Sequence, residues 1–161
     1  MTEQAGERFT VGIDFGTLSG RAVITRVSDG EIVGEAVHPY ENAVMDRFLT
    51  AGDGRELPPD FALQVPDDYR QVLRTAVPQA VEASGVSPSD IVGIGVDFTS
   101  ATVIFADDDG VPLCELDGFR NEPHAYAKLW KHHGAQEQAH RIVDLAKERG
   151  ETWLARYGGE L

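Results

Sequence analysis

The sequence predicts an α/β fold that begins with an antiparallel meander of three strands. Apolar and polar residues alternate over 8–15, which is a strand pattern, and two further β-rich runs follow after tight turns. A stretch with helical spacing comes next, and a nearly continuous apolar run follows it at 91–97. Strands, a helix and a further strand in this order are typical of a layered α/β domain.

The turns define the meander. Gly16 follows the first strand, and the run at 20–26 is rich in β-branched residues. Asp29-Gly30 is a strong hairpin signal, because both central positions of such a turn need positive φ. The third strand is then expected over 31–38.

The helix is expected over 67–84, where apolar residues recur at helical spacing. Acidic residues at 67 and 68 suit its positive N-terminal end. Pro78 predicts a kink or a division of the helix, and Gly85 predicts its end. The run at 91–97 has the composition of a parallel strand that is buried on both faces.

The remaining segments are less regular. Residues 42–66 have no clean period and contain several prolines and glycines, so we expect an irregular excursion over the surface. Short strands are expected at 102–106 and 111–116, on either side of an acidic turn. Two helices are then expected, near 123–132 and 135–149.

Composition excludes several classes of protein. Apolar residues make up 42% of the 161, so a sizeable core can form. With 14 Lys and Arg against 27 Asp and Glu, the net charge of −13 argues against binding nucleic acid or anionic membranes. The one cysteine, Cys114, excludes an internal disulfide and is interpreted as a small hydrophobe. A signal sequence and a membrane-spanning run are not recognised, so a cytoplasmic protein is expected.

The segment 14–21, DFGTLSGR, is the first candidate for chemistry. Glycine lets the backbone approach a ligand, and the N–H groups of such a turn can point at phosphate oxygens. Thr17 and Ser19 add hydroxyl donors, and Asp14 offers the oxygen ligands that Mg²⁺ prefers. The P-loop pattern is absent. An ordinary β-turn with a surface aspartate remains the alternative.

Two further segments are candidates. The run at 93–102 delivers Asp97, Thr99 and Ser100 to the C-terminal end of a strand, where ligands of open α/β sheets collect. Taken alone, however, the segment fits better with a strand end whose small residues pack under a helix. Trp130 is either a core aromatic or a platform whose indole N–H meets a sugar hydroxyl. The histidines nearby show no metal-ligand spacing.

Together these segments resemble the FGGY family of sugar kinases, in the actin-like ATPase superfamily. VGIDFGTLSGRAV at 11–23 resembles the family's first phosphate loop, and VGIGVDFTSAT at 92–102 resembles its sugar-contacting strand end. KLWKHHGAQ at 128–136 resembles a Trp-bearing segment, and ARYGGE at 155–160 also matches. The resemblance runs from about residue 9 to 161.

The resemblance implies a ribonuclease H-like (actin-like ATPase) domain that uses ATP and Mg²⁺. The implied reaction transfers the γ-phosphoryl group to the 5-hydroxyl of L-ribulose, with a xylulose- or glycerol-type kinase of another ketose or polyol as the alternative. Residue by residue, it implies that the phosphates are bound by Asp14, Gly16, Thr17, Ser19 and Arg21, with Asp14 also facing the metal. It implies that the sugar is bound by Thr99, Ser100 and Trp130.

Family members are much longer, and the resemblance implies that the catalytic aspartate and the adenosine pocket lie beyond Leu161. We therefore expect residues 1–161 to be part of the N-terminal, sugar-binding lobe, without the C-terminal lobe and without the catalytic base. Such a piece is expected to be inactive alone and to depend on the remaining part of the kinase or on self-association. A split enzyme, and a non-catalytic sugar-binding, nucleotide-binding or oligomerisation module, are the alternatives.

Overall fold

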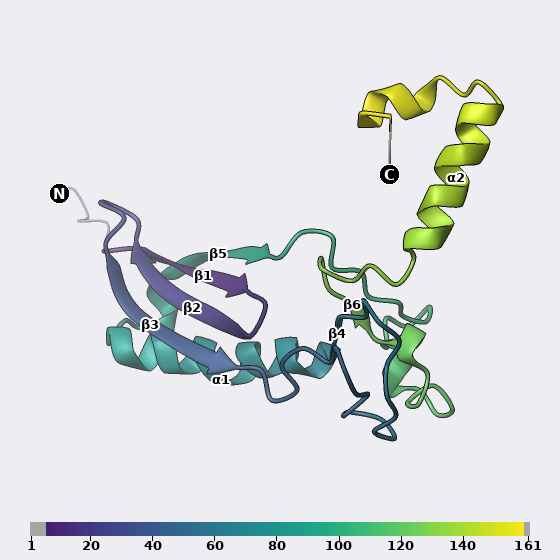
Figure 1. Cartoon of the computed structure of the whole chain (residues 1–161). Helices are drawn as coiled ribbons and strands as arrows, with labels where there is room; N and C mark the ends of the chain where they lie inside the picture. Colours follow the sequence, from purple (N-terminus) through teal and green to yellow (C-terminus); the bar gives the residue numbers. More distant parts are fainter. Residues whose placement is uncertain (1–5, 160–161) are drawn as a thin grey trace.

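Four strands between Phe9 and Phe98 form one sheet (Figure 1). The computed structural model describes residues 6–159. The predicted meander is confirmed as β1 (Phe9–Phe15), β2 (Ser19–Arg26) and β3 (Ile32–Pro39), and each pair is antiparallel. β5 (Ile91–Phe98) lies parallel to β1, which gives the strand order β3-β2-β1-β5. The connection from β2 to β3 spans residues 27–31 and places Gly30 at φ 77°, but Asp29 does not have a positive φ. The predicted turn with positive φ at both central positions is therefore wrong, because a longer loop joins the two strands.

Helix α1 (Pro66–Ser84) covers one face of β1, β2 and β3 (Figure 1). The core between them contains buried side chains from the strands and from one stripe of the helix: Phe9, Val11, Ile13, Ala22, Ile24, Tyr40, Val72, Ala76 and Ala80. Gly85 ends the helix at φ 66°. The predicted division at Pro78 is wrong, because packing of the helix on both sides of the proline holds one continuous element.

Strand β5 departs from the prediction of a strand buried on both faces. Ile94, Val96 and Phe98 are 71, 56 and 66% exposed, since α1 packs mainly on β2 and β3. The strand is also at the edge of the described sheet. An exposed edge that carries apolar side chains favours association with another chain or segment.

The segment between β5 and the C-terminal helix differs most from expectation. The strands predicted at 102–106 and 111–116 are reduced to single bridges from Val103 to Lys128 and from Ala106 to Pro112, with a 3₁₀ turn at Leu113–Glu115. The helix predicted at 123–132 is wrong, because only Pro123–Ala125 is helical, as a 3₁₀ turn.

Long-range strand pairs replace the helix predicted at 123–132. The chain continues as β6 (Ala127–Lys128), which pairs with β4 (Leu63–Gln64) inside the excursion predicted to be irregular. Backbone groups that would bond within a helix bond across strands instead. Beneath these pairs lies a second core: Met45, Leu49, Leu57, Phe61, Leu63, Cys114, Ala125 and Tyr126.

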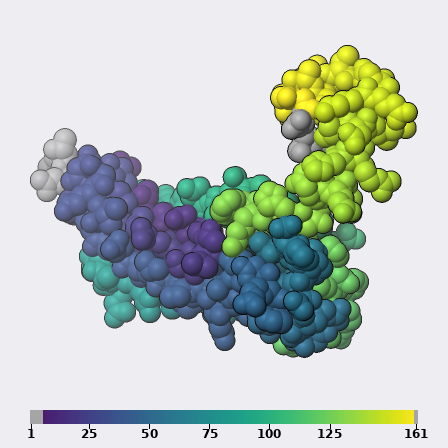
Figure 2. Space-filling model, in the orientation of Figure 1, coloured from purple at the N-terminus to yellow at the C-terminus, as the bar shows by residue number. Residues whose placement is uncertain are grey.

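The C-terminal part stands away from the body of the molecule (Figure 2). The helix predicted at 135–149 is confirmed as α2 (Gln136–Glu148), and a 3₁₀ helix follows at Trp153–Tyr157. Val143, Ala146 and Leu154 form a small cluster of their own. A further 3₁₀ turn, Pro88–Asp90, precedes β5. Among the described residues, none of the helices combines the length and the apolar character needed to cross a bilayer.

Two expectations concern the last residues of the chain. The segment that matches ARYGGE is described as far as Gly159, and Gly158 ends the 3₁₀ helix at φ 79°. Glu160 and Leu161 lie outside the described residues. The expectation that the catalytic aspartate lies beyond Leu161 therefore stays a prediction, as does the extent of the sugar-binding lobe.

Candidate functional site

The first element of the candidate site is the loop between β1 and β2. β1 ends at Phe15 and β2 begins at Ser19, so residues 16–18 form the loop. The backbone N–H of Gly16 donates to the carbonyl of Ser19 over 2.9 Å. A Cβ at Gly16 would lie 3.0 Å from that same oxygen, which explains why glycine begins the loop.

The loop is fixed from below by buried polar groups. Gln64 is 1% exposed, and its side-chain amide donates to the carbonyl of Thr17 over 2.8 Å. The backbone N–H of Tyr40 donates to the carbonyl of Leu18 over 2.9 Å. The carbonyls of both Thr17 and Leu18 therefore have hydrogen-bond partners, which hold the loop at two points.

Trp130 lies against this loop. Its indole N–H donates to the Thr17 hydroxyl oxygen over 3.4 Å, although the two residues are 113 positions apart. The side chain is 55% exposed, so it is not a core aromatic. The backbone N–H of Leu129 donates to the carbonyl of Ala62 over 3.0 Å, which holds the Trp-bearing segment beside β4. The structure thus brings the first and third candidate segments together.

The end of β5 reaches the same edge of the sheet. The backbone N–H of Thr99 donates to the carbonyl of Phe15 over 3.1 Å, so the C-terminal ends of β1 and β5 are joined. The hydroxyl groups of Thr99 and Thr102 lie 2.9 Å apart, and Ala101 between them has φ 59°. Ser100 is exposed. Two candidate sugar residues therefore lie beyond the strand end, near the start of the loop.

Three charged residues share the sheet face opposite α1. Asp14 pairs in register with Arg21 on β2 and with Asp97 on β5, and the three line a hollow of about 460 Å³. Ser19 begins β2, beside Pro39 of β3. Asp97 was a candidate at the end of its strand, but the resemblance gave it no role in binding, and the structure places it beside Asp14. The position of Asp97 beside Asp14 follows from the parallel register of β1 and β5, which could not be derived from the sequence.

The oxygen of Asp14 is a donor type that suits Mg²⁺, which keeps several waters when it binds proteins. In the part of the chain described, no three His, Cys, Asp or Glu side chains gather closely enough to enclose a metal ion. A divalent ion at this position would therefore be held by one or two carboxylates and by substrate oxygens, which is an arrangement common for Mg²⁺ with phosphates.

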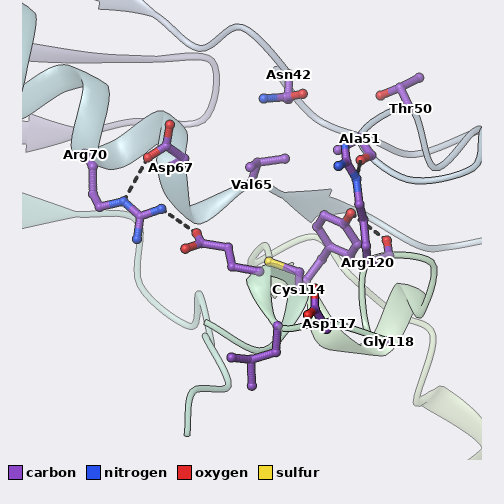
Figure 3. A pocket seen from close by; sticks show the side chains of 13 residues that line it. Asn42, Thr50, Ala51, Val65, Asp67, Arg70, Cys114, Asp117, Gly118 and Arg120 are labelled. Atoms are coloured by element: carbon purple, nitrogen blue, oxygen red, sulfur yellow. Dashed lines mark hydrogen bonds and ion pairs between the residues drawn. The ribbon is translucent and has the colours of Figure 1, made fainter. Parts of the chain in front are cut away.

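A larger hollow of about 630 Å³ lies elsewhere, and none of the predicted site residues lines it (Figure 3). Its arginines are engaged with protein groups: Arg70 donates to Asp67 over 2.9 Å, and Arg120 donates to the carbonyl of Ala51 over 3.2 Å. Cys114 also lines it, and burial raises the pKa of its thiol to about 11. The thiol stays neutral, in agreement with its interpretation as a small hydrophobe.

His132 supports the Trp130 segment with a hydrogen bond that depends on pH. Its Nδ1 accepts from the backbone N–H of Ala62 over 3.1 Å, so this nitrogen carries no proton. Burial lowers the pKa of His132 from 6.5, and the nearby Lys128, His124 and His133 lower it further. The folded chain therefore favours the neutral ring.

Acidification is expected to destabilise the chain through this histidine. Above pH 6.5 the ring is neutral in both the folded and the unfolded chain, so the stabilisation from this histidine is complete. Below pH 6.5 the unfolded chain binds the proton more readily than the folded chain does. The free energy of unfolding therefore falls as the pH approaches the lowered pKa of His132 in the folded chain. Chemical denaturation at pH 7.5 and 5.5 measures the loss. His132→Gln, whose oxygen can still accept, should lose less than wild type. The exposed His140→Gln is the control, and an undiminished loss in His132→Gln would refute the assignment.

A scan against models of protein families finds no match. Solved structures with a similar fold include a xylulose kinase from Brucella ovis (TM-score 0.65, 19% identity, 92% of this chain and 29% of that one). A xylulose kinase from Rhodospirillum rubrum has a TM-score of 0.59 at 18% identity, over 84% of this chain and 23% of that one. These neighbours are FGGY sugar kinases with an actin-like ATPase fold, and the similarity of this chain to them confirms the predicted fold class.

The sequence relatives are more specific. Ribulokinase from Mycolicibacterium smegmatis is 54% identical over 99% of this chain, and ribulokinase from Geobacillus thermodenitrificans is 46% identical over 97%. The chain is therefore a homologue of the N-terminal region of ribulokinases, which confirms the resemblance. It spans 28 and 27% of the length of these two relatives.

Proposed function

We propose that this chain forms the first part of the sugar-binding lobe of an ATP-dependent kinase that phosphorylates the 5-hydroxyl of L-ribulose. The observation that carries the proposal is the contact between Thr17 and Trp130. It joins the loop that resembles a phosphate-binding element to the indole that resembles a sugar platform. Transfer of a phosphoryl group requires both substrates to be held side by side, so this contact has a direct functional meaning.

The phosphate side of the site is assigned to the β1–β2 loop. Gly16 permits close approach of the backbone, and Thr17 offers its hydroxyl at the exposed edge. Asp14 and Arg21 face the open side of the sheet, where Asp14 would hold Mg²⁺ and Arg21 would balance charge. Ser19 closes the turn through its carbonyl. When bound, Mg²⁺ neutralises charge on the transferred phosphoryl group.

The sugar side is assigned to Trp130, Thr99 and Ser100. The exposed indole ring offers an apolar face for the carbon skeleton of a ketopentose. Hydroxyl groups beyond β5 offer hydrogen-bond partners to sugar hydroxyls, and the Thr99 backbone is tied to the end of β1. No residue of this chain is assigned as the catalytic base, which the resemblance puts in a segment of the family that corresponds to positions beyond Leu161.

The remaining part of the kinase is the proposed partner of the exposed β5 face. Ile94, Val96 and Phe98 leave apolar surface uncovered on the side of the sheet that α1 covers elsewhere. The relatives have about three-quarters of their length outside the matched region. A further segment of kinase chain, joined or supplied separately, would bury this surface.

A chimera tests the proposal. In it, this chain replaces the matched region of Mycolicibacterium smegmatis ribulokinase, to which it is 54% identical. We expect ADP formation from Mg·ATP that depends on L-ribulose, with much lower kcat/KM for D-xylulose and glycerol. A higher kcat/KM for D-xylulose or glycerol than for L-ribulose would reject L-ribulose as the substrate and indicate a kinase of another ketose or polyol. A folded chimera without activity on any of the three, beside an active parent, would reject a catalytic role and leave a non-catalytic module.

A further inference from the structure

Gln64 has an unusual position for a polar residue. It lies in the two-residue strand β4 and is 1% exposed, and of its chain neighbours, Leu63 belongs to the second core and Val65 packs against it. Burying an amide costs free energy unless its donor and acceptor are both paired. Both are paired here: Nε2 donates to the carbonyl of Thr17 over 2.8 Å, and Oε1 accepts from the Tyr69 hydroxyl over 2.7 Å.

Tyr69 provides the fixed end of this arrangement. Its ring makes edge-to-face contacts with Phe15 at 5.9 Å and with Tyr40 at 5.6 Å between ring centroids. These two partners lie at the end of β1 and just after β3. Burial raises the pKa of Tyr69 well above its usual value, so the hydroxyl keeps its proton and donates. The amide of Gln64 therefore has one orientation, with its N–H directed at Thr17.

The same short strand also holds the Trp130 segment. Two residues before Gln64, Ala62 accepts a hydrogen bond from the Leu129 backbone and donates one to His132. Gln64 itself pairs in register with Ala127 of β6. A displacement of β4 would therefore move the loop and the indole together, since both are bound to it.

We propose that Gln64 is a positioning residue that holds the Thr17 carbonyl so that the Thr17 hydroxyl meets the indole of Trp130. It touches neither phosphate nor sugar, and it acts through Thr17. In phosphoryl transfer, Gln64 would keep the phosphate subsite and the sugar subsite at a fixed separation, and this role rests on the proposed function. The link itself exists without ligand and can be tested without one.

The test uses the two tryptophans of the chain, Trp130 and Trp153, whose indole N–H groups give two signals in a ¹H–¹⁵N spectrum. Trp153 lies in the C-terminal 3₁₀ helix and is the internal control. Gln64→Leu should shift the Trp130 signal and speed its exchange with solvent about fivefold, the factor expected when one hydrogen bond is lost. The Trp153 signal should not move. An unchanged Trp130 signal in the folded variant would overturn the proposal.

Two further variants separate positioning from general stability. Tyr69→Phe keeps the ring and removes only the hydroxyl that donates to Gln64. It should therefore shift the Trp130 signal in the same direction as Gln64→Leu does, but by less. This variant replaces Gln64→Leu in the test if Gln64→Leu does not fold. In Gln64→Glu, the ionised carboxylate cannot donate to Thr17, whereas the protonated acid can. Acidification should therefore return the Trp130 signal of this variant toward that of wild type at the same pH. Failure of both responses would reject positioning by Gln64.

No ligand is present in these spectra, so the result is independent of the kinase assay. An inactive chimera with the expected indole shifts would reject the proposed function and retain the link. An active chimera without those shifts would reject only the role of Gln64.

Discussion

Alanine in place of Gly34 is expected to destabilise the chain by on the order of 3 kcal/mol, the upper part of the range for overpacked cores. A Cβ at this position would lie 2.5 Å from the carbonyl oxygen of Ala80 and 2.8 Å from the backbone nitrogen of Ser84. These are backbone atoms of α1, so the clash cannot be relieved by a side-chain rotation. The helix would have to move away from β3.

Gly95→Ala is the matched control. Gly95 also lies in a strand, but a Cβ there meets nothing within 4 Å. Its effect on stability should be within about 0.5 kcal/mol. Urea denaturation of the two variants beside wild type makes the comparison. Equal stability of the two variants would mean that α1 does not pack on the sheet as closely as described.

Asp14→Asn is expected to lower kcat of the chimera by about 10²–10³-fold, the size typical for loss of one group that stabilises charge in a transition state. The substitution keeps the shape of the side chain and removes the charge proposed to hold Mg²⁺. Asp14 is exposed, so the free energy of unfolding should change by no more than about 0.5 kcal/mol. Steady-state kinetics with saturating Mg·ATP and L-ribulose measures the effect.

The control for this substitution is Asp109→Asn, in the exposed turn at 107–110. It carries the same change of charge outside the proposed site and should leave kcat within about twofold of the parent. Equal activity of the Asp14 and Asp109 variants would remove Asp14 from the site. Raising the Mg²⁺ concentration should partly restore the Asp14 variant, whereas the control should not respond.

The meander could be predicted because its signals are local. Alternation over β1 and the Asp29-Gly30 turn lie within a few residues of the hydrogen bonds that they specify. The end of α1 at Gly85 is equally local. The exposure of β5 could not be predicted from such local signals. A run of Ile, Val and Gly indicates a strand that can be buried, but whether a covering layer is present depends on the rest of the fold.

The segment at 123–132 shows the opposite case. Its apolar spacing allows a helix, but Lys128 bonds to Val103 and β6 pairs with β4, and these partners are distant in sequence. Tertiary pairing therefore overrides the local pattern. Trp130 and Thr17 were assigned to one site only through resemblance to a family, and the structure places them in contact. Gln64 gave no signal, since a single glutamine in an irregular segment has no period and its partner lies 47 positions away.

In the proposed function, Thr17 and Trp130 belong to one site. A double-mutant cycle in the chimera with Thr17→Val and Trp130→Phe tests it directly, because each change removes one partner of the hydrogen bond and keeps most of the side-chain shape. We predict that the effects on kcat/KM for L-ribulose are not additive, with a coupling energy of at least ~0.5 kcal/mol. Effects that add to within ~0.3 kcal/mol would show that the loop and the indole act independently, and would contradict the account.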